Sequence, residues 1–295
     1  MIETVNLNQI IEDTAVALLR TSATRLPFDV ELAMQKIKDD NISESTLLQM
    51  TNILDNVKIA REQSKPMCQD TGIIAFKIEV GDDFPIKSNL KEIFKAATRR
   101  ATKEIPLRPN TVDFFEGNPG DNIDIRGHIP YFYIDLVPGN ELKILATTKG
   151  GGSSNIAQLG MLKPGLGMEG ALKFAIDVIA DAGPQGCPPY RVGIGIGGGE
   201  DICMTLAKKA IFKPIGERHQ DPRVAKLEES VMEAANLLPI GPMGVGDGKT
   251  VIDVNIELAS RHPASLPVGV VMSCWALRYG SAKINSDGNV TFLEN

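Results

Sequence analysis

The sequence is poor in cysteine and in aromatic residues, and it contains no long apolar run. Four cysteines are spread over 295 residues, and aromatic residues make up 5% of the chain. Cysteines so few and so widely spaced are not a secreted disulfide framework, so they indicate a reducing compartment in which thiols bind metal or lie buried. No apolar stretch reaches the roughly 20 residues that span a bilayer, and the N-terminus is acidic and amphipathic, unlike a signal peptide. We therefore expect a cytoplasmic protein outside the membrane.

The sequence also has fewer basic than acidic residues. Lys and Arg total 31 against 37 Asp and Glu, which gives a net charge of −6. This balance provides no general attraction to nucleic acid or to an anionic membrane. An anionic substrate must therefore be bound by a few local cations. The hydrophobic content of 43% is typical of a soluble globular protein.

The periodicity predicts a mixed α+β fold, in which a helical N-terminal region packs on mixed or antiparallel sheets. Apolar spacing and capping signals predict helices within 7–62 and at 89–105, 168–182, 200–212 and 221–238. Strands are predicted at 73–80, 131–137, 142–147, 251–258 and 267–272. We expect the strands 131–137 and 142–147 to pair around the turn between them. The sequence has no repeat and no low-complexity linker, so a single domain over 1–295 is predicted.

Three of the four cysteines lie at the edge of a turn or strand. Cys68, Cys187 and Cys274 each stand beside Pro, Gly or Ser, and Cys187 precedes a proline as in bacterial ferredoxin ligand runs. Three thiolates on separate loops can bind three irons of a 4Fe–4S cluster and leave the fourth open as a Lewis acid. Unrelated buried thiols are an equal alternative, and a zinc site is a weaker one because no short C-x₂₋₄-C pair is present. Cys203 lies on an apolar helix face, where we expect it in the core.

Polar candidates for catalysis stand near these cysteines in the sequence. Arg108, in a proline-rich turn, can bind a carboxylate with its planar guanidinium. His262 can share a proton with Asp70 if their loops meet, although Asp70 also suits a turn. The segment 149–155 resembles an anion-binding nest. The G-x-G-x-x-G pattern at 193–198 is a weak dinucleotide signal, because no clear βαβ unit surrounds it.

Six short motifs occur in order along the chain. They are CQDTG (68–72), LRPN (107–110), KGGGSSN (149–155), GCPPY (186–190), RHP (261–263) and CWA (274–276). Together they resemble the iron–sulfur (class I) fumarate hydratases, in the part that is an α subunit or the N-terminal region of a longer chain. The related tartrate dehydratase α subunit shares the cysteine motifs but not the KGGGSSN form, which favours fumarate.

The resemblance implies a complete set of site residues. Cys68, Cys187 and Cys274 would bind a 4Fe–4S cluster, and Asp70 and His262 would be catalytic. The implied substrate contacts are Gln69, Asp70, Arg108, Gly151 and His262.

The activity implied is the reversible hydration of fumarate to L-malate in the tricarboxylic acid cycle, with a β subunit as partner in a hetero-oligomer. Within the class, the alternative is the α subunit of a tartrate or methylfumarate (mesaconate) dehydratase. From other classes, an NAD-binding oxidoreductase and a non-catalytic metal-binding scaffold are also open.

Overall fold

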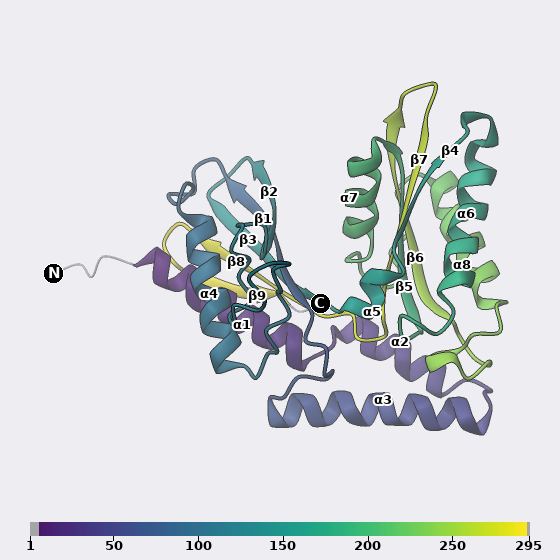
Figure 1. Ribbon diagram of the computed structural model, residues 1–295, viewed down its shortest axis with the longest axis horizontal. Coiled ribbons are helices and arrows are strands. Elements are labelled where there is room, and N and C mark those ends of the chain that lie inside the picture. Colours follow the sequence, from purple (N-terminus) through teal and green to yellow (C-terminus); the bar gives the residue numbers. More distant parts are fainter. Residues whose placement is uncertain (1–5, 294–295) are drawn as a thin grey trace. The chain divides into compact units, whose positions relative to one another are not determined.

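Figure 1 shows the computed structural model, which describes residues 6–293. The chain divides into two compact units, and it passes between them after Phe28, Leu54, Gly150 and Leu277. Unit 1 contains the chain up to Phe28, Asp55–Gly150 and the part from Arg278 onward; unit 2 contains Asp29–Leu54 and Gly151–Leu277. Because the units interleave, no linker marks their boundary in the sequence. The single domain over 1–295 stays a prediction.

Unit 1 is a five-stranded sheet covered by helices. Its elements are α1 (Leu7–Thr24), the second half of α3 (Glu44–Gln63), β1 (Ile73–Gly81), α4 (Leu90–Glu104), β2 (Tyr131–Val137), β3 (Glu141–Lys149), β8 (Tyr279–Asn285) and β9 (Val290–Leu293). The strand order is β2-β1-β3-β8-β9. Alternate residues of the central strands, such as Phe76, Ile78 and Ile144, pack with α1 and α4 in one apolar core. The apolar residues that alternate along these strands therefore lie on the face of the sheet that the helices cover.

The strands β2 and β3 are separated by β1, so their predicted pairing is wrong. β1 pairs with β2 in parallel and with β3 antiparallel. The turn from β2 to β3 crosses the end of β1 at Gly81, where a Cβ atom would lie 2.2 Å from the carbonyl oxygen of Gly139. Glycine is required there because any side chain would collide with the crossing backbone.

Unit 2 is a four-stranded sheet with helices on both faces. Its elements are most of α2 (Phe28–Lys38), the first half of α3, α5 (Gly151–Asn155), β4 (Gln158–Leu162), η1 (Pro164–Leu166), α6 (Gly167–Ala182), β5 (Tyr190–Gly198), α7 (Glu200–Ala210), α8 (Pro222–Asn236), η2 (Pro242–Gly244), β6 (Val251–Arg261) and β7 (Leu266–Ser273). The strand order is β4-β7-β5-β6. Figure 1 shows α7 on one face of this sheet and α6 with α8 on the other. The predicted mixed fold is confirmed.

Two glycines of the G-x-G-x-x-G pattern have a packing role. A Cβ atom at Gly193 would lie 2.1 Å from the carbonyl oxygen of Ala207, and one at Gly195 would lie 2.0 Å from that of Cys203. These glycines bring β5 against α7, which explains the pattern without a dinucleotide. Cys203 is fully buried, as predicted, and burial raises the pKa of its thiol.

The helix starts predicted from capping signals within 7–62 and at 221 also agree with the structure. Asp221 caps α8 by accepting a 2.9 Å hydrogen bond from the N–H of Arg223, and Pro222 takes the first helical position. Ser43 caps α3 through a 3.3 Å bond from the N–H of Thr46. Among the helices of residues 6–293, none has the length and apolar character that a membrane span needs.

Candidate functional site

In unit 1, the turn that follows Cys68 places Asp70 at the entrance to β1. The N–H of Met67 donates to the carbonyl oxygen of Ala23 at 3.0 Å, and the Asn56 side chain donates to the carbonyl oxygen of Met67 at 2.7 Å. Asp70 Oδ1 accepts a 2.9 Å bond from the N–H of Gly72. Asp70 Oδ1 therefore stabilises the turn, as the position of Asp70 in the sequence predicted. Asp70 Oδ2 takes no part in this bond.

The loop that carries Arg108 lies against this turn. The N–H of Arg108 donates to Thr71 Oγ1 at 2.9 Å, and Asn110 Nδ2 lies 3.4 Å from Asp70 Oδ1 and 3.1 Å from the carbonyl oxygen of Gly72. The structure therefore brings together Asp70 and the Arg108 segment, which are separate in the sequence. The side chains of Gln69 and Arg108 are exposed.

Arg278, which no motif had indicated, lies beside Asp70. Its side chain is 3% exposed, and its Nη1 donates to the carbonyl oxygen of Asp70 at 2.6 Å. Arg278 Nη2 and Asp70 Oδ2 both face Gly150, where an added Cβ atom would lie 3.1 Å and 2.9 Å from them. We call Cys68, Asp70, Arg108, Asn110 and Arg278 the Asp70 cluster.

In unit 2, Cys187 lies in a turn that the hydroxyl of Tyr190 holds from two sides. This hydroxyl donates to the carbonyl oxygen of Gly183 at 2.7 Å and accepts from the N–H of Gly186 at 3.0 Å. Tyr190 is fully buried, and burial raises its pKa to about 12, so the hydroxyl keeps its proton. Cys187 itself has a φ of +60°, a conformation that non-glycine residues adopt at a cost.

Cys274 belongs to the same end of the unit 2 sheet as Cys187. β7 runs antiparallel to β5 with Arg191 opposite Ser273, so the end of β7 meets the start of β5. The N–H of Trp275 donates to the carbonyl oxygen of Cys187 at 3.0 Å. Neither cysteine forms a disulfide. Unit 2 therefore brings together two of the three predicted ligands.

The start of α5 lies close to the Cys187 turn. A Cβ atom at Gly152 would lie 3.4 Å from the carbonyl oxygen of Gln185, and one at Gly186 would lie 2.3 Å from the side chain of Ile156. Gly151, a predicted substrate contact, is the first residue of this short helix. We call Gly151, Gly152, Cys187, Tyr190 and Cys274 the Cys187 cluster.

His262 lies at the opposite end of the unit 2 sheet. β6 runs parallel to β5, with Val251 opposite Tyr190 and Arg261 opposite Gly198. His262 follows the far end of β6, about 30 Å along the strand from the end that carries the cysteines. Its Nδ1 accepts a 3.1 Å bond from the N–H of Ala264. One copy of unit 2 therefore does not bring His262 to the Cys187 cluster.

The two clusters belong to different units, and each has residues that stand next to a unit boundary in the sequence. Gly150, which faces Asp70 and Arg278 in unit 1, is followed directly by Gly151 of the Cys187 cluster in unit 2. Likewise, Cys274 of unit 2 stands four residues before Arg278 of unit 1. Within residues 6–293, no group of three His, Cys, Asp or Glu side chains of metal-binding type is found. The joining of Cys68 with Cys187 and Cys274 stays a prediction.

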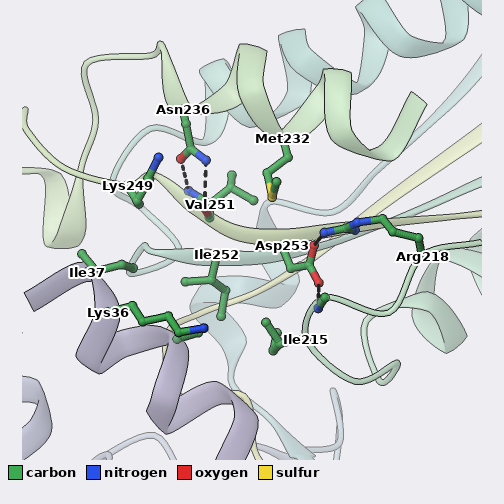
Figure 2. A pocket seen from close by; sticks show the side chains of 12 residues that line it. Lys36, Ile37, Ile215, Arg218, Met232, Asn236, Lys249, Val251, Ile252 and Asp253 are labelled. Atoms are coloured by element: carbon green, nitrogen blue, oxygen red, sulfur yellow. Dashed lines mark hydrogen bonds and ion pairs between the residues drawn. The ribbon is translucent and has the colours of Figure 1, made fainter. Parts of the chain in front are cut away.

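A separate hollow of about 280 Å³ lies in unit 2 between α2, α8 and β6 (Figure 2). Its lining includes Lys36, Lys249 and Arg218, and none of the predicted site residues contributes to it. Beside it, Asn236 makes a two-bond contact with the backbone of Val251, at 2.9 and 3.1 Å. Arg218 pairs with the buried carboxylate of Asp253 at 2.5 Å.

Comparison with known proteins gives the class of this chain, which is that of the hydro-lyases. The sequence profile of the family described as fumarate hydratase (Fumerase) matches residues 12–283, and the chain belongs to this family. The family consists of iron–sulfur-dependent hydro-lyases.

Relatives of this chain include several that are named for tartrate. A Methanocaldococcus jannaschii chain provisionally named L(+)-tartrate dehydratase subunit alpha is 40% identical over 283 residues, which cover 95% of this chain and 99% of the relative. The L(+)-tartrate dehydratase subunits alpha of Escherichia coli and Shigella sonnei are 37% identical over 267 residues, covering 90% of this chain and 88% of each relative. The expected family is therefore confirmed, whereas the preference for fumarate over tartrate is not.

Proposed function

We propose that this chain is the catalytic α subunit of a 4Fe–4S hydro-lyase that dehydrates a four-carbon hydroxydicarboxylate, with L(+)-tartrate as the first candidate substrate. The observation that carries the proposal is the Cys187 cluster. It has two thiols outside any disulfide, on loops joined by the Trp275–Cys187 backbone bond, beside a short helix that begins with glycine. The names of the relatives support tartrate.

The donor set fits an iron–sulfur cluster. Thiolates are the ligands that such clusters use. Cys187 and Cys274, like Cys68 in unit 1, form no disulfide and are half-buried. The left-handed backbone at Cys187 is a conformation kept where a side chain must be aimed. Cys68, Cys187 and Cys274 would hold the cluster, and when bound it supplies a Lewis acid for the leaving hydroxyl.

The protein side chains then bind the substrate and move protons. Loss of water takes a hydroxyl from one carbon and a proton from the next, and tartrate thereby yields an enol that rearranges to a 2-oxo dicarboxylate. Arg108 would neutralise a substrate carboxylate, and Gln69 and the N–H of Gly151 would orient it. Asp70 would deliver the proton to the departing hydroxyl.

His262 keeps its predicted role only under one condition. Because unit 2 places it at the far end of the sheet from the cysteines, a second copy of the chain would have to supply it. We assign the group that takes the carbon-bound proton to a β subunit. The name "subunit alpha" of the relatives supports such a partner.

The second candidate reaction is the hydration of fumarate to L-malate. The description of the family profile and the KGGGSSN segment at 149–155 favour it. Both reactions need the same cluster and differ only in the hydroxyl on the second carbon.

The test is an anaerobic assay of the reconstituted α/β pair with L(+)-tartrate, L-malate, fumarate and mesaconate. We expect kcat/KM to be highest for L(+)-tartrate, with D-tartrate as the matched control for stereochemistry. Turnover of malate and fumarate alone would move the assignment to the second candidate. Iron and sulfide analysis separates the other classes: about four of each per chain supports the hydro-lyase, whereas zinc without sulfide would indicate a scaffold, and an absence of metal would reject the proposal.

A further inference from the structure

The loop after Arg108 presents two phenylalanine side chains to solvent. Phe114 is 98% exposed and Phe115 is 86% exposed, and the neighbouring Val112 is 62% exposed. We call Val112, Phe114 and Phe115 the aromatic tip. Single exposed apolar residues are common on soluble proteins, but adjacent large ones that are almost fully exposed mark surfaces that bind something.

The aromatic tip is held rigidly by Asp113. The carboxylate of Asp113 accepts hydrogen bonds from the N–H groups of Phe115 and Glu116, at 2.9 and 3.1 Å, and from Arg126 Nε at 2.7 Å. Its backbone also exchanges two hydrogen bonds with Gly117. The turn is therefore fixed before any partner arrives, which lowers the entropy lost when its side chains are buried.

The same loop fixes the position of Arg108. Asn122 Nδ2 donates to the carbonyl oxygen of Arg108 at 3.0 Å, and Asn118 Nδ2 donates to that of Pro109 at 2.6 Å. The N–H of Asn110 donates back to Asn122 Oδ1 at 2.7 Å. The aromatic tip and the candidate substrate cation thus belong to one folded loop of unit 1.

We propose that the aromatic tip is an anchor for the β-type subunit of the enzyme. This inference rests on the proposed function, in which the partner brings the base for the carbon-bound proton to the substrate held by Arg108. Phe114 follows Arg108 by six residues in this loop, so a subunit that approaches the substrate beside Arg108 is close enough to contact the tip. Exposed, preorganised aromatic side chains are the residues that dominate binding energy in such interfaces.

The experiment measures the binding of the α chain to the β-type subunit of the same organism, by anaerobic biolayer interferometry. We expect the variant F114A/F115A to raise Kd at least about 30-fold, as loss of two anchor residues does. The control F28A/L237A removes apolar side chains that are 72% and 86% exposed in other places, and Kd should stay within about threefold. The variant D113N, which keeps both rings and loosens their turn, should give an intermediate increase.

Three results would overturn the inference. If the wild type and F114A/F115A bind the β-type subunit equally, the tip is no anchor and the proposed function stands. If F114A/F115A changes the oligomeric state of the α chain alone in light scattering, the tip binds a second copy instead. If the wild-type chain does not bind the β-type subunit at all, the two-subunit part of the proposed function fails as well.

Discussion

Arg278 Nη1 donates a 2.6 Å hydrogen bond to the backbone carbonyl oxygen of Asp70, across 208 residues of sequence. A buried guanidinium makes this a charge-assisted bond, which is shorter and stronger than a neutral one. Arg278 therefore holds the turn that presents the Asp70 carboxylate. Under the proposed function, Arg278 would affect the reaction through the position of Asp70.

Replacement of Arg278 should lower turnover more than stability. We expect R278M to reduce kcat about 10- to 100-fold, since losing a hydrogen bond to a charged group costs roughly 1.5–3 kcal/mol. R278K, which keeps the charge, should recover part of the loss. Steady-state kinetics of the α/β pair and thermal unfolding of each variant measure the effect. A kcat for R278M within twofold of the wild type would show that Asp70 keeps its position without this bond.

Removal of the Tyr190 hydroxyl should loosen the Cys187 turn. Y190F leaves the ring in place but removes the bonds to Gly183 and Gly186. We expect faster hydrogen exchange at Gly186 and a loss of the iron–sulfur absorbance in air about 10-fold faster, as for other supporting groups of metal ligands.

The matched control for Y190F is T98V. Thr98 is equally buried, and its hydroxyl donates to the carbonyl oxygen of Phe94 at 2.8 Å, within α4 of unit 1. T98V should leave cluster stability unchanged. Equal rates of cluster loss in Y190F and the wild type would show that the turn does not depend on the hydroxyl.

The four cysteines should separate into two classes on substitution. C187S should abolish the cluster absorbance and the activity, because a serine oxygen replaces a thiolate ligand. C203A should keep both, since Cys203 is fully buried against β5 and β7 and serves packing. Anaerobic reconstitution followed by absorbance and iron analysis distinguishes them. Retention of a full cluster by C187S would reject the ligand assignment.

Asp113 should make stability depend on pH in the acid range. The hydrogen bond from Arg126, with those from Phe115 and Glu116, lowers the pKa of Asp113 from 3.8 to about 2. A carboxyl whose folded pKa is depressed stabilises the protein above its unfolded pKa, and this contribution disappears as the pH falls through the folded pKa. The wild type should therefore be more stable than D113N at pH 7, and the difference should shrink between pH 4 and pH 2. Urea unfolding at each pH measures it, and a difference that is constant down to pH 2 would contradict the assignment.

Elements with strong local signals were predictable from the sequence. The Asp221–Pro222 pair fixed the start of α8, and the apolar face around Cys203 predicted its burial. The neighbours of β2 and β3 in the sheet were not predictable, because the pattern of a strand does not reveal which strand lies next to it. Here β1 lies between them, and the turn from β2 to β3 crosses the end of β1 at Gly81, where a larger residue would collide with the turn.

The candidate site was predictable where motifs carried it. The Asp70 and Arg108 segments meet, and Cys187 and Cys274 share one end of a sheet. The contact of Arg278 with the Asp70 turn could not be predicted, because this hydrogen bond joins residues that are far apart in the sequence. The place of His262 depends on strand direction and register, which a short motif beside a strand does not contain.

The outer edge of β6 has a consequence for how larger assemblies form. β6 ends the unit 2 sheet, and backbone groups in its first half bind side chains instead of a further strand. Asn236 bonds Val251, Arg218 donates to the carbonyl oxygen of Val254 at 2.9 Å, and Glu228 accepts from the N–H of Ile256 at 2.9 Å. Side-chain bonds of this kind block the pairing of a further strand along this part of the edge. Any strand added to the unit 2 sheet would therefore have to pair with β4, at the opposite border.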